Sequence, residues 1–241
     1  VGTNGEMALY ASGRGWVTSV PAGPAFEGGE IGCGMAALPG AVRHVTVHED
    51  SWELETVDDL APCGVCGSGL VAIIAAALDG GLIDRQGTIV TADRIQTNLS
   101  RYIVATADGP ALRLYRDARI DLLLTQQDIR QFQLAKGAVR AGVECLLQRA
   151  GVLADQVEEV VLTGAFGFSL LPNVLKRVAI LPETVVEKVR FMPAGALAGV
   201  IRFLREPRAV GVLDALTGTL RPYPLSGTPA FEKAFLRALD F

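Results

Sequence analysis

Three glycine-rich segments contain the residue types that bind phosphate groups. They read GTNGE at 2–6, CGVCGSG at 63–69 and TGAFG at 163–167. Glycine lets backbone amides approach an anion, and a helix that follows adds the positive end of its dipole. Each segment is equally compatible with a tight connection and nothing more. None matches the GxxxxGK[ST] loop, and no GxGxxG lies where a dinucleotide fold needs it.

The first and second segments also carry side chains suited to this chemistry. Asn4-Gly5 is a strong signal for a tight turn, because both residues tolerate positive φ. Thr3 adds a hydroxyl and Glu6 a carboxylate, so the turn predicts either a plain hairpin or a phosphate site. In the second segment, Gly67, Ser68 and Gly69 directly precede an apolar helix.

Other candidate groups are an amide, a cation, and sets of cysteines and histidines. Gln133 and Lys136 lie one helical turn apart and share a face, where they can contact a base or ribose; for Lys136 an ordinary surface position is the alternative. Cys63 and Cys66 form a CxxC, which is typical of a redox pair or half of a metal site. Only Cys33 and Cys145 remain to complete four ligands, so we expect reduced thiols and no metal. His44 and His48 lie about 13 Å apart on a predicted strand, too far to share one ion.

The elements that must position these groups alternate between strands and helices, which predicts an α/β fold with a mixed or parallel sheet covered by helices. Thr125 and Asp128 resemble a capping box ahead of a long helix, and Gly151 follows its end. We expect a strand hairpin at 6–11 and 15–20, strands at 42–48, 52–57, 120–124, 157–163 and 185–191, short polar strands within 88–118, and helices at 68–78, 126–150 and 193–204.

Composition narrows the function classes. The net charge of −4 and the pI near 5.3 argue against nucleic-acid binding. The richest apolar run, 70–78, is too short to cross a bilayer, and no signal peptide is recognisable. Four cysteines in 241 residues favour a reducing cytoplasm. The first residue, Val1, lies in a strand-like stretch, and the mean hydropathy of +0.34 is high, so we expect a part of a longer protein.

Five motifs in a fixed order carry a family resemblance: GTNGE, PAGPAFEGGEIGCGM, GVCGSGL, LTQQDIRQFQLAKGAVRAG and LTGAFG. Together they make residues 1–241 resemble the C-terminal part of the reductive activators of corrinoid proteins. That family belongs to the ATPase superfamily of acetate and sugar kinases, heat-shock chaperones and actin. The resemblance implies an actin-like, ribonuclease H-like half-domain with a small peripheral β insertion at about 85–118. It also implies an N-terminal ferredoxin domain and a first half-domain outside this chain.

The resemblance also implies roles for the candidate residues. The nucleotide-binding residues would be Gly2, Thr3, Asn4, Gly5, Gly67, Ser68, Gly69, Gln133, Lys136, Gly164, Ala165, Phe166 and Gly167. Glu6 would be the catalytic carboxylate near Mg²⁺, the cofactor would be ATP, and a 2Fe-2S cluster would lie only in the N-terminal region. Two departures concern the nucleotide: Phe168-Ser169 replaces Asn-Tyr, and Pro193-Ala194-Gly195-Ala196 replaces Gly-Asn-Ala-Ala.

The implied function is ATP-driven electron transfer that returns the Co(II) corrinoid protein of a methyltransferase system to Co(I). The expected partners are that corrinoid protein and the other ATPase half-domain, with a homodimer as a further option. This half-domain alone is expected to be inactive. Two alternatives stay open: a small-molecule kinase of the same superfamily, and an interaction module that docks partners without ATP turnover.

Overall fold

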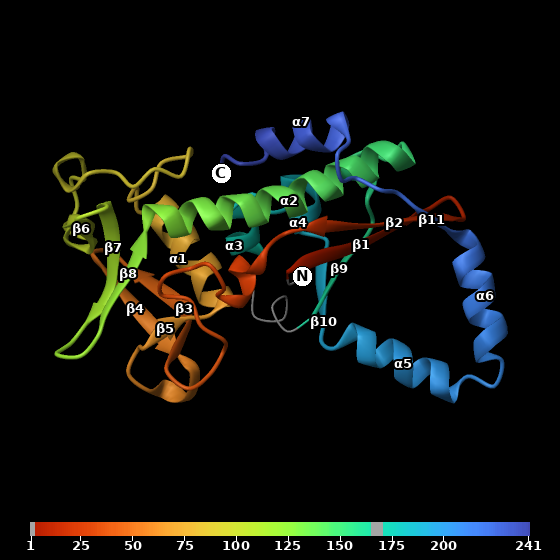
Figure 1. The fold of residues 1–241 in the computed structure, drawn as a ribbon, viewed down its shortest axis with the longest axis horizontal. Helices are drawn as coiled ribbons and strands as arrows, with labels where there is room; N and C mark the ends of the chain where they lie inside the picture. Colours follow the sequence, from red (N-terminus) through yellow and green to blue (C-terminus); the bar gives the residue numbers. More distant parts are fainter. Residues whose placement is uncertain (1–2, 165–170) are drawn as a thin grey trace.

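The computed structural model describes residues 3–164 and 171–241. Its longest element is α2 (Gln126–Ala150), which runs from the end of β8 (Asp121–Thr125) across the strands β1 (Asn4–Ala11) and β2 (Arg14–Pro21) (Figure 1). The strands form small sheets with both parallel and antiparallel pairs. No helix in the described ranges is long and apolar enough to cross a membrane.

The first sheet holds the candidate phosphate residues. β1 (Asn4–Ala11) and β2 (Arg14–Pro21) form an antiparallel hairpin in which Glu6 lies opposite Ser19, and β11 (Leu220–Pro222) pairs parallel with β2. The predicted hairpin is confirmed, but the predicted turn at Asn4-Gly5 is wrong. Both residues lie inside β1, and the turn is made by Ser12 and Gly13, whose φ values are both positive.

The second sheet holds the CxxC segment. β3 (Ala41–His48) pairs antiparallel with β4 (Ser51–Thr56) and parallel with β5 (Gly64–Val65). β5 leads directly into α1 (Gly67–Asp79), which is buried along nearly its whole length because its sequence is almost entirely apolar. These elements agree with the strands and helix predicted for 42–78.

The third sheet contains most of the segment that was predicted as a peripheral insertion, and it packs against the core. β6 (Ile103–Thr106), β7 (Gly109–Arg116) and β8 (Asp121–Thr125) form an antiparallel sheet. Leu112 on β7 is fully buried in the main hydrophobic core, so this segment is integrated into the fold.

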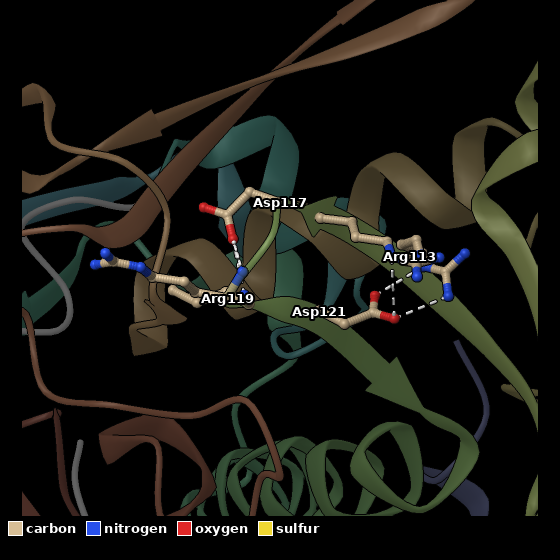
Figure 2. Close-up of polar contacts among 6 residues, drawn as sticks. Arg113, Asp117, Arg119 and Asp121 are labelled. Carbon is tan, nitrogen blue, oxygen red and sulfur yellow. Dashed lines mark hydrogen bonds and ion pairs between the residues drawn. The ribbon is translucent and has the colours of Figure 1, made fainter.

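The turn between β7 and β8 is fixed by its own polar groups (Figure 2). Arg113 donates two hydrogen bonds to Asp121, of 2.7 and 2.9 Å. Asp117 accepts from the amides of Arg119 and Ile120, and these bonds hold the pKa of its carboxyl below the usual value. This polar cluster stabilises a surface turn.

The long helix α2 begins and ends where the sequence predicts. Thr125 and Asp128 form the capping box, and Gly151 takes the left-handed conformation at the other end. Ile129 and Phe132 on this helix are fully buried in the core. α7 (Pro229–Arg237) lies along α2 (Figure 1).

The last part of the chain departs most from the sequence prediction. β9 (Val160–Thr163) and β10 (Val189–Met192) pair in parallel, but residues 185–186, predicted as strand, end the short helix α4 (Glu183–Val186). α3 (Pro172–Arg177) precedes it, and α5 (Gly195–Arg205) and α6 (Ala209–Thr219) follow β10. The helices α4 and α6 and the strand β11 had not been predicted. Short 3-10 helices occupy Pro24–Glu27, Val57–Asp59, Ala92–Arg94, Asn98–Tyr102 and Ala154–Gln156.

Candidate functional site

The start of β1 is held by a carboxylate from the glycine-rich loop. Thr3 donates its backbone N–H and its hydroxyl to the two carboxylate oxygens of Glu27, each at 3.0 Å. The carbonyl of Thr3 accepts from the amide of Gly23 at 2.9 Å. Glu27 therefore sets the position of Thr3, the candidate phosphate residue. Gly2 lies outside the described residues.

Glu27 was missed as a functional residue by the sequence reasoning, although its motif was noticed. It ends a 3-10 helix that begins at Pro24, and Gly28 follows in the left-handed conformation at φ 80°. The available signal was the acid followed by two glycines, Glu27-Gly28-Gly29, because such a sequence permits a sharp turn that aims the carboxylate back at the chain.

We expect Glu27→Ala to loosen the start of β1. The substitution removes two acceptors, and hydrogen bonds to charged groups contribute about 1.5–3 kcal/mol each when well shielded, less at an exposed position such as this one. Amide hydrogen exchange at Thr3 should become at least several-fold faster. Glu30→Ala, in the same loop, is the matched control and should leave this exchange rate unchanged. Equal exchange in both variants would contradict the positioning role.

Glu6 lies further along β1, on the face turned away from α2. Its side chain is exposed and lines an open, mostly apolar surface depression of about 730 Å³ bounded by β1, β2 and the segment 222–226. Asn4, which begins β1, is exposed too. Gly5 lies on the opposite face, where an added Cβ would lie 3.0 Å from Val20 and 3.8 Å from Val139 of α2. The strand thus presents polar groups on one face and packs its glycine on the other.

The second glycine segment is packed against β3. Gly67, Ser68 and Gly69 are buried in the first turn of α1. A Cβ added to Gly69 would lie 2.0 Å from the carbonyl oxygen of Val42, so the helix approaches the strand backbone as closely as a glycine allows. This contact gives Gly69 a packing role in addition to the nucleotide role that the sequence predicts.

All four cysteines are free thiols; Cys33, Cys63 and Cys66 lie in or beside this segment, and Cys145 is buried on α2. Cys66 is buried and its Sγ lies 3.2 Å from the Val42 carbonyl oxygen, whereas Cys63 is exposed. Burial, with the nearby Asp128 carboxylate, raises the pKa of Cys33 to about 12. Within residues 3–164 and 171–241, no group of three or more His, Cys, Asp or Glu side chains is arranged to hold a metal ion.

Gln133 and Lys136 do share a face of α2, but that face is covered. Gln133 donates to the carbonyl oxygens of Gln86 at 3.0 Å and Leu239 at 2.9 Å. Lys136 is fully buried; its Nζ donates to the carbonyl oxygen of Asp240 and lies 4.8 Å from the centre of the Phe241 ring. Contact with a nucleotide by either side chain would therefore require segment 239–241 to move away.

The third glycine segment begins at the carboxyl ends of two parallel strands. Gly164 follows β9 with φ 106°, a backbone conformation that residues with a side chain rarely adopt. Thr163 Oγ1 accepts from the amide of Gly195 at 2.8 Å and so ties the end of β9 to the start of α5. Ligands of open α/β sheets bind at such carboxyl ends. Ala165, Phe166 and Gly167 lie outside the described residues.

Ala194, just before α5, adds a second unusual conformation at this end of the sheet. It is left-handed at φ 49° and ψ 42°, which costs a residue with a Cβ about 1–2 kcal/mol. Strained backbone concentrates at ligand sites, where the surrounding structure holds it in place. The turn at Gly164 and the start of α5 thus bring two unusual backbone conformations to the carboxyl end of the β9–β10 pair.

Comparisons with known proteins agree with this architecture. The corrinoid activation enzyme RamQ of Eubacterium limosum is 29% identical over 249 residues, which cover 98% of this chain and 41% of RamQ. The Co(II) methylated amine-specific corrinoid protein reductase of Methanosarcina barkeri is 26% identical over 212 residues, which cover 79% of this chain and 35% of the reductase. The chain thus spans about two fifths of the length of these relatives or less.

A solved structure shares the fold over the whole chain. It is described as a reductive activator for corrinoid, iron-sulfur protein, and it matches with a TM-score of 0.87 and 28% identity. The match covers 100% of this chain and 38% of the solved chain. The α/β class and the superfamily implied by the sequence motifs are therefore confirmed. The family model described as the C-terminal domain of RACo, the ASKHA domain, matches residues 1–241, and the chain belongs to this family.

Proposed function

We propose that this chain is the nucleotide-binding portion of an ATP-dependent activator that returns a Co(II) corrinoid protein to the Co(I) state. The observation that carries the proposal is the glycine turn at Gly164, at the carboxyl ends of the parallel pair β9–β10. The relatives named as a corrinoid activation enzyme and a corrinoid protein reductase supply the direction of the chemistry.

The described residues suit ATP and Mg²⁺. Glu6 presents an exposed carboxylate at the edge of the open surface depression, and magnesium prefers such oxygen ligands. Asn4, the first residue of β1, presents an exposed amide that can donate to phosphate oxygens, whereas the N–H and hydroxyl of Thr3 are both engaged by Glu27. Gly164 has a φ of 106°, a backbone conformation that residues with a Cβ rarely adopt. ATP with Mg²⁺, when bound, supplies the free energy of phosphoryl transfer.

Within this proposal each residue has a positional role. Gly2, Thr3, Asn4 and Gly5 orient the phosphates, Glu6 holds the metal, and residues 164–167 receive the adenosine. Glu27 fixes Thr3, because both of its carboxylate oxygens are engaged there. The 2Fe-2S cluster that supplies the electron, and the opposing phosphate loop, belong to the N-terminal part of the full-length protein.

The first test measures ATP binding by calorimetry on the full-length protein. Gly164→Val should reduce affinity at least tenfold, because the side chain fills the adenosine space. Gly109→Val is the matched control: Gly109 has a similar φ of 114° and open space around it, so it carries the same backbone strain far from the site. Unchanged ATP binding by Gly164→Val would refute the adenosine role.

The second test measures ATP hydrolysis and the reduction of cobalt in a corrinoid protein. Glu6→Gln in the full-length protein should retain ATP binding but slow both ATP hydrolysis and the appearance of the Co(I) spectrum of a corrinoid partner. ATP hydrolysis that proceeds with a small phosphate acceptor and no corrinoid protein would favour the kinase alternative. Co(I) formation that needs no ATP would favour the interaction module.

A further inference from the structure

A surface pocket of about 270 Å³ lies where four segments that are far apart in the sequence meet. It is lined by Arg85, Arg140, Glu144, Ala179, Arg237, Ala238, Asp240 and Phe241. Figure 1 shows the C-terminal end of the chain beside α2 and α7, whereas β9 and β10 end on the other side of α2. The pocket is therefore separate from the glycine turn at Gly164, and it shares no residue with the depression beside Glu6.

Two of the arginines that line the pocket are held in place by one part of their guanidinium group. Arg140 on α2 donates from Nε to Glu144 at 2.6 Å and from one terminal nitrogen to the carbonyl oxygen of Leu181 at 2.7 Å. Arg85 donates from Nε to the carbonyl oxygen of Phe241 at 3.4 Å, and its own carbonyl accepts from the Phe241 amide at 2.8 Å. The remaining terminal nitrogens of both side chains have no partner within residues 3–164 and 171–241.

The third arginine, Arg237, offers a complete guanidinium group. It is exposed in the last turn of α7, and its side chain forms neither a hydrogen bond nor an ion pair with any residue that the structure describes. Arginine binds phosphate and carboxylate groups through two parallel N–H donors, which adds geometric fit to the charge. Arg237 can therefore hold an oxyanion in this way without giving up an existing contact.

The pocket carries more positive than negative charge. Its three arginines face two carboxylates, Glu144 and Asp240, and Glu144 is already paired with Arg140. Lys136 lies beneath, fully buried, with its Nζ donating to the carbonyl oxygen of Asp240. Burial, with the positive charge of Arg140, lowers the pKa of Lys136 to about 7. The surroundings therefore disfavour a further cation, and an anion in the pocket would offset this charge.

We propose that this pocket binds a phosphate group, either as inorganic phosphate or as the phosphomonoester of a small molecule. A phosphate group carries a charge of about −1.5 to −2 at neutral pH. That charge matches the balance here, because the three arginines and a protonated Lys136 stand against two carboxylates. The volume is below the about 300–1,000 Å³ of sites for drug-sized ligands, which fits a compact anion. The proposal does not depend on the proposed nucleotide site.

Calorimetric titration of the full-length protein with inorganic phosphate tests the proposal. At low ionic strength, where exposed charges are least screened, we expect binding with a Kd below about 1 mM. Arg237→Gln should weaken this binding at least tenfold, because it removes the charge and the paired donors. Arg119→Gln is the matched control, since Arg119 is an exposed arginine in the turn between β7 and β8 whose side chain forms no ion pair with a described residue. It should bind phosphate like the wild type.

Two further titrations identify the site and the source of the phosphate group. Gly164→Val should leave phosphate binding unchanged, because the pocket lies on the other side of α2 from the glycine turn. Glycerol phosphate, titrated in the same way, separates the two sources. Tighter binding of the ester would identify a small phosphorylated molecule as the ligand, and tighter binding of inorganic phosphate would identify the free ion.

Three outcomes would overturn the proposal. The first is the absence of binding at phosphate concentrations up to about 10 mM, ten times the expected Kd. The second is equal affinity in the wild type, Arg237→Gln and Arg119→Gln, which would mean that Arg237 is an ordinary solvated arginine. The third is binding that is lost in Gly164→Val and kept in Arg237→Gln, which would assign the phosphate to the nucleotide turn.

Discussion

Gly69→Ala is expected to destabilise the chain by about 3 kcal/mol or more. The new Cβ would lie 2.0 Å from the carbonyl oxygen of Val42 and 2.7 Å from its carbonyl carbon, far inside contact distance. The strand cannot give way easily, because the same carbonyl accepts from the amide of Cys66 at 3.0 Å. Overpacking of a rigid core site usually costs about 1–3 kcal/mol, and a clash with backbone falls at the upper end.

Urea unfolding of the chain measures this effect, with Gly199→Ala as the control. Gly199 is also inside a helix but has nothing within 4 Å of its added Cβ. That variant should be neutral or more stable by about 0.4–1 kcal/mol, because alanine restricts the unfolded chain. A loss below about 1 kcal/mol for Gly69→Ala would show that α1 can move away from β3.

The free energy of unfolding of the chain should rise by on the order of 3–4 kcal/mol between pH 7 and pH 10 because of Lys136 alone. A proton that is bound in the unfolded state and not in the folded state changes this free energy by about 1.4 kcal/mol per pH unit. Burial, with the nearby Arg140 guanidinium, lowers the pKa of Lys136 to about 7 in the folded protein, against 10.5 for an ordinary lysine. Within this window the unfolded chain holds the proton and the folded chain does not. Raising the pH therefore favours the folded state.

Denaturant unfolding at several pH values checks this dependence. Lys136→Met keeps a long apolar side chain on α2 and should remove the rise between pH 7 and 10. Lys233→Met, at an exposed position on α7, should retain it. An identical pH profile for wild type and Lys136→Met would mean that Lys136 remains charged beneath segment 239–241.

Local signals in the sequence predicted the elements well. The Thr125–Asp128 capping box and Gly151 fixed both ends of α2, because capping depends on residues within one turn. Asn4-Gly5 misled because strand pairing with β2 outweighed a local turn preference, and Ser12-Gly13 made the turn instead. The alternation of strands and helices was enough to establish the α/β class, which the structural comparison confirms.

Contacts between residues far apart in the sequence could not be predicted from the sequence pattern. Lys136 meets Asp240 across 104 residues, and Thr3 meets Glu27 across 24. Periodicity places Gln133 and Lys136 on one face of a helix but does not show what covers that face. The family motifs brought Glu6 and Gly164 forward as candidates, and their nucleotide roles stay predictions.

The thiols described above differ sharply in accessibility, with a practical consequence for spectroscopy. Cys66 and Cys145 are buried, and burial raises the pKa of Cys33 to about 12, so its reactive thiolate form is scarce at neutral pH. Cys63 is exposed. A maleimide fluorophore would therefore attach selectively at Cys63 without any mutagenesis. Because Cys63 begins the glycine segment before α1, the dye would report on movements of that segment.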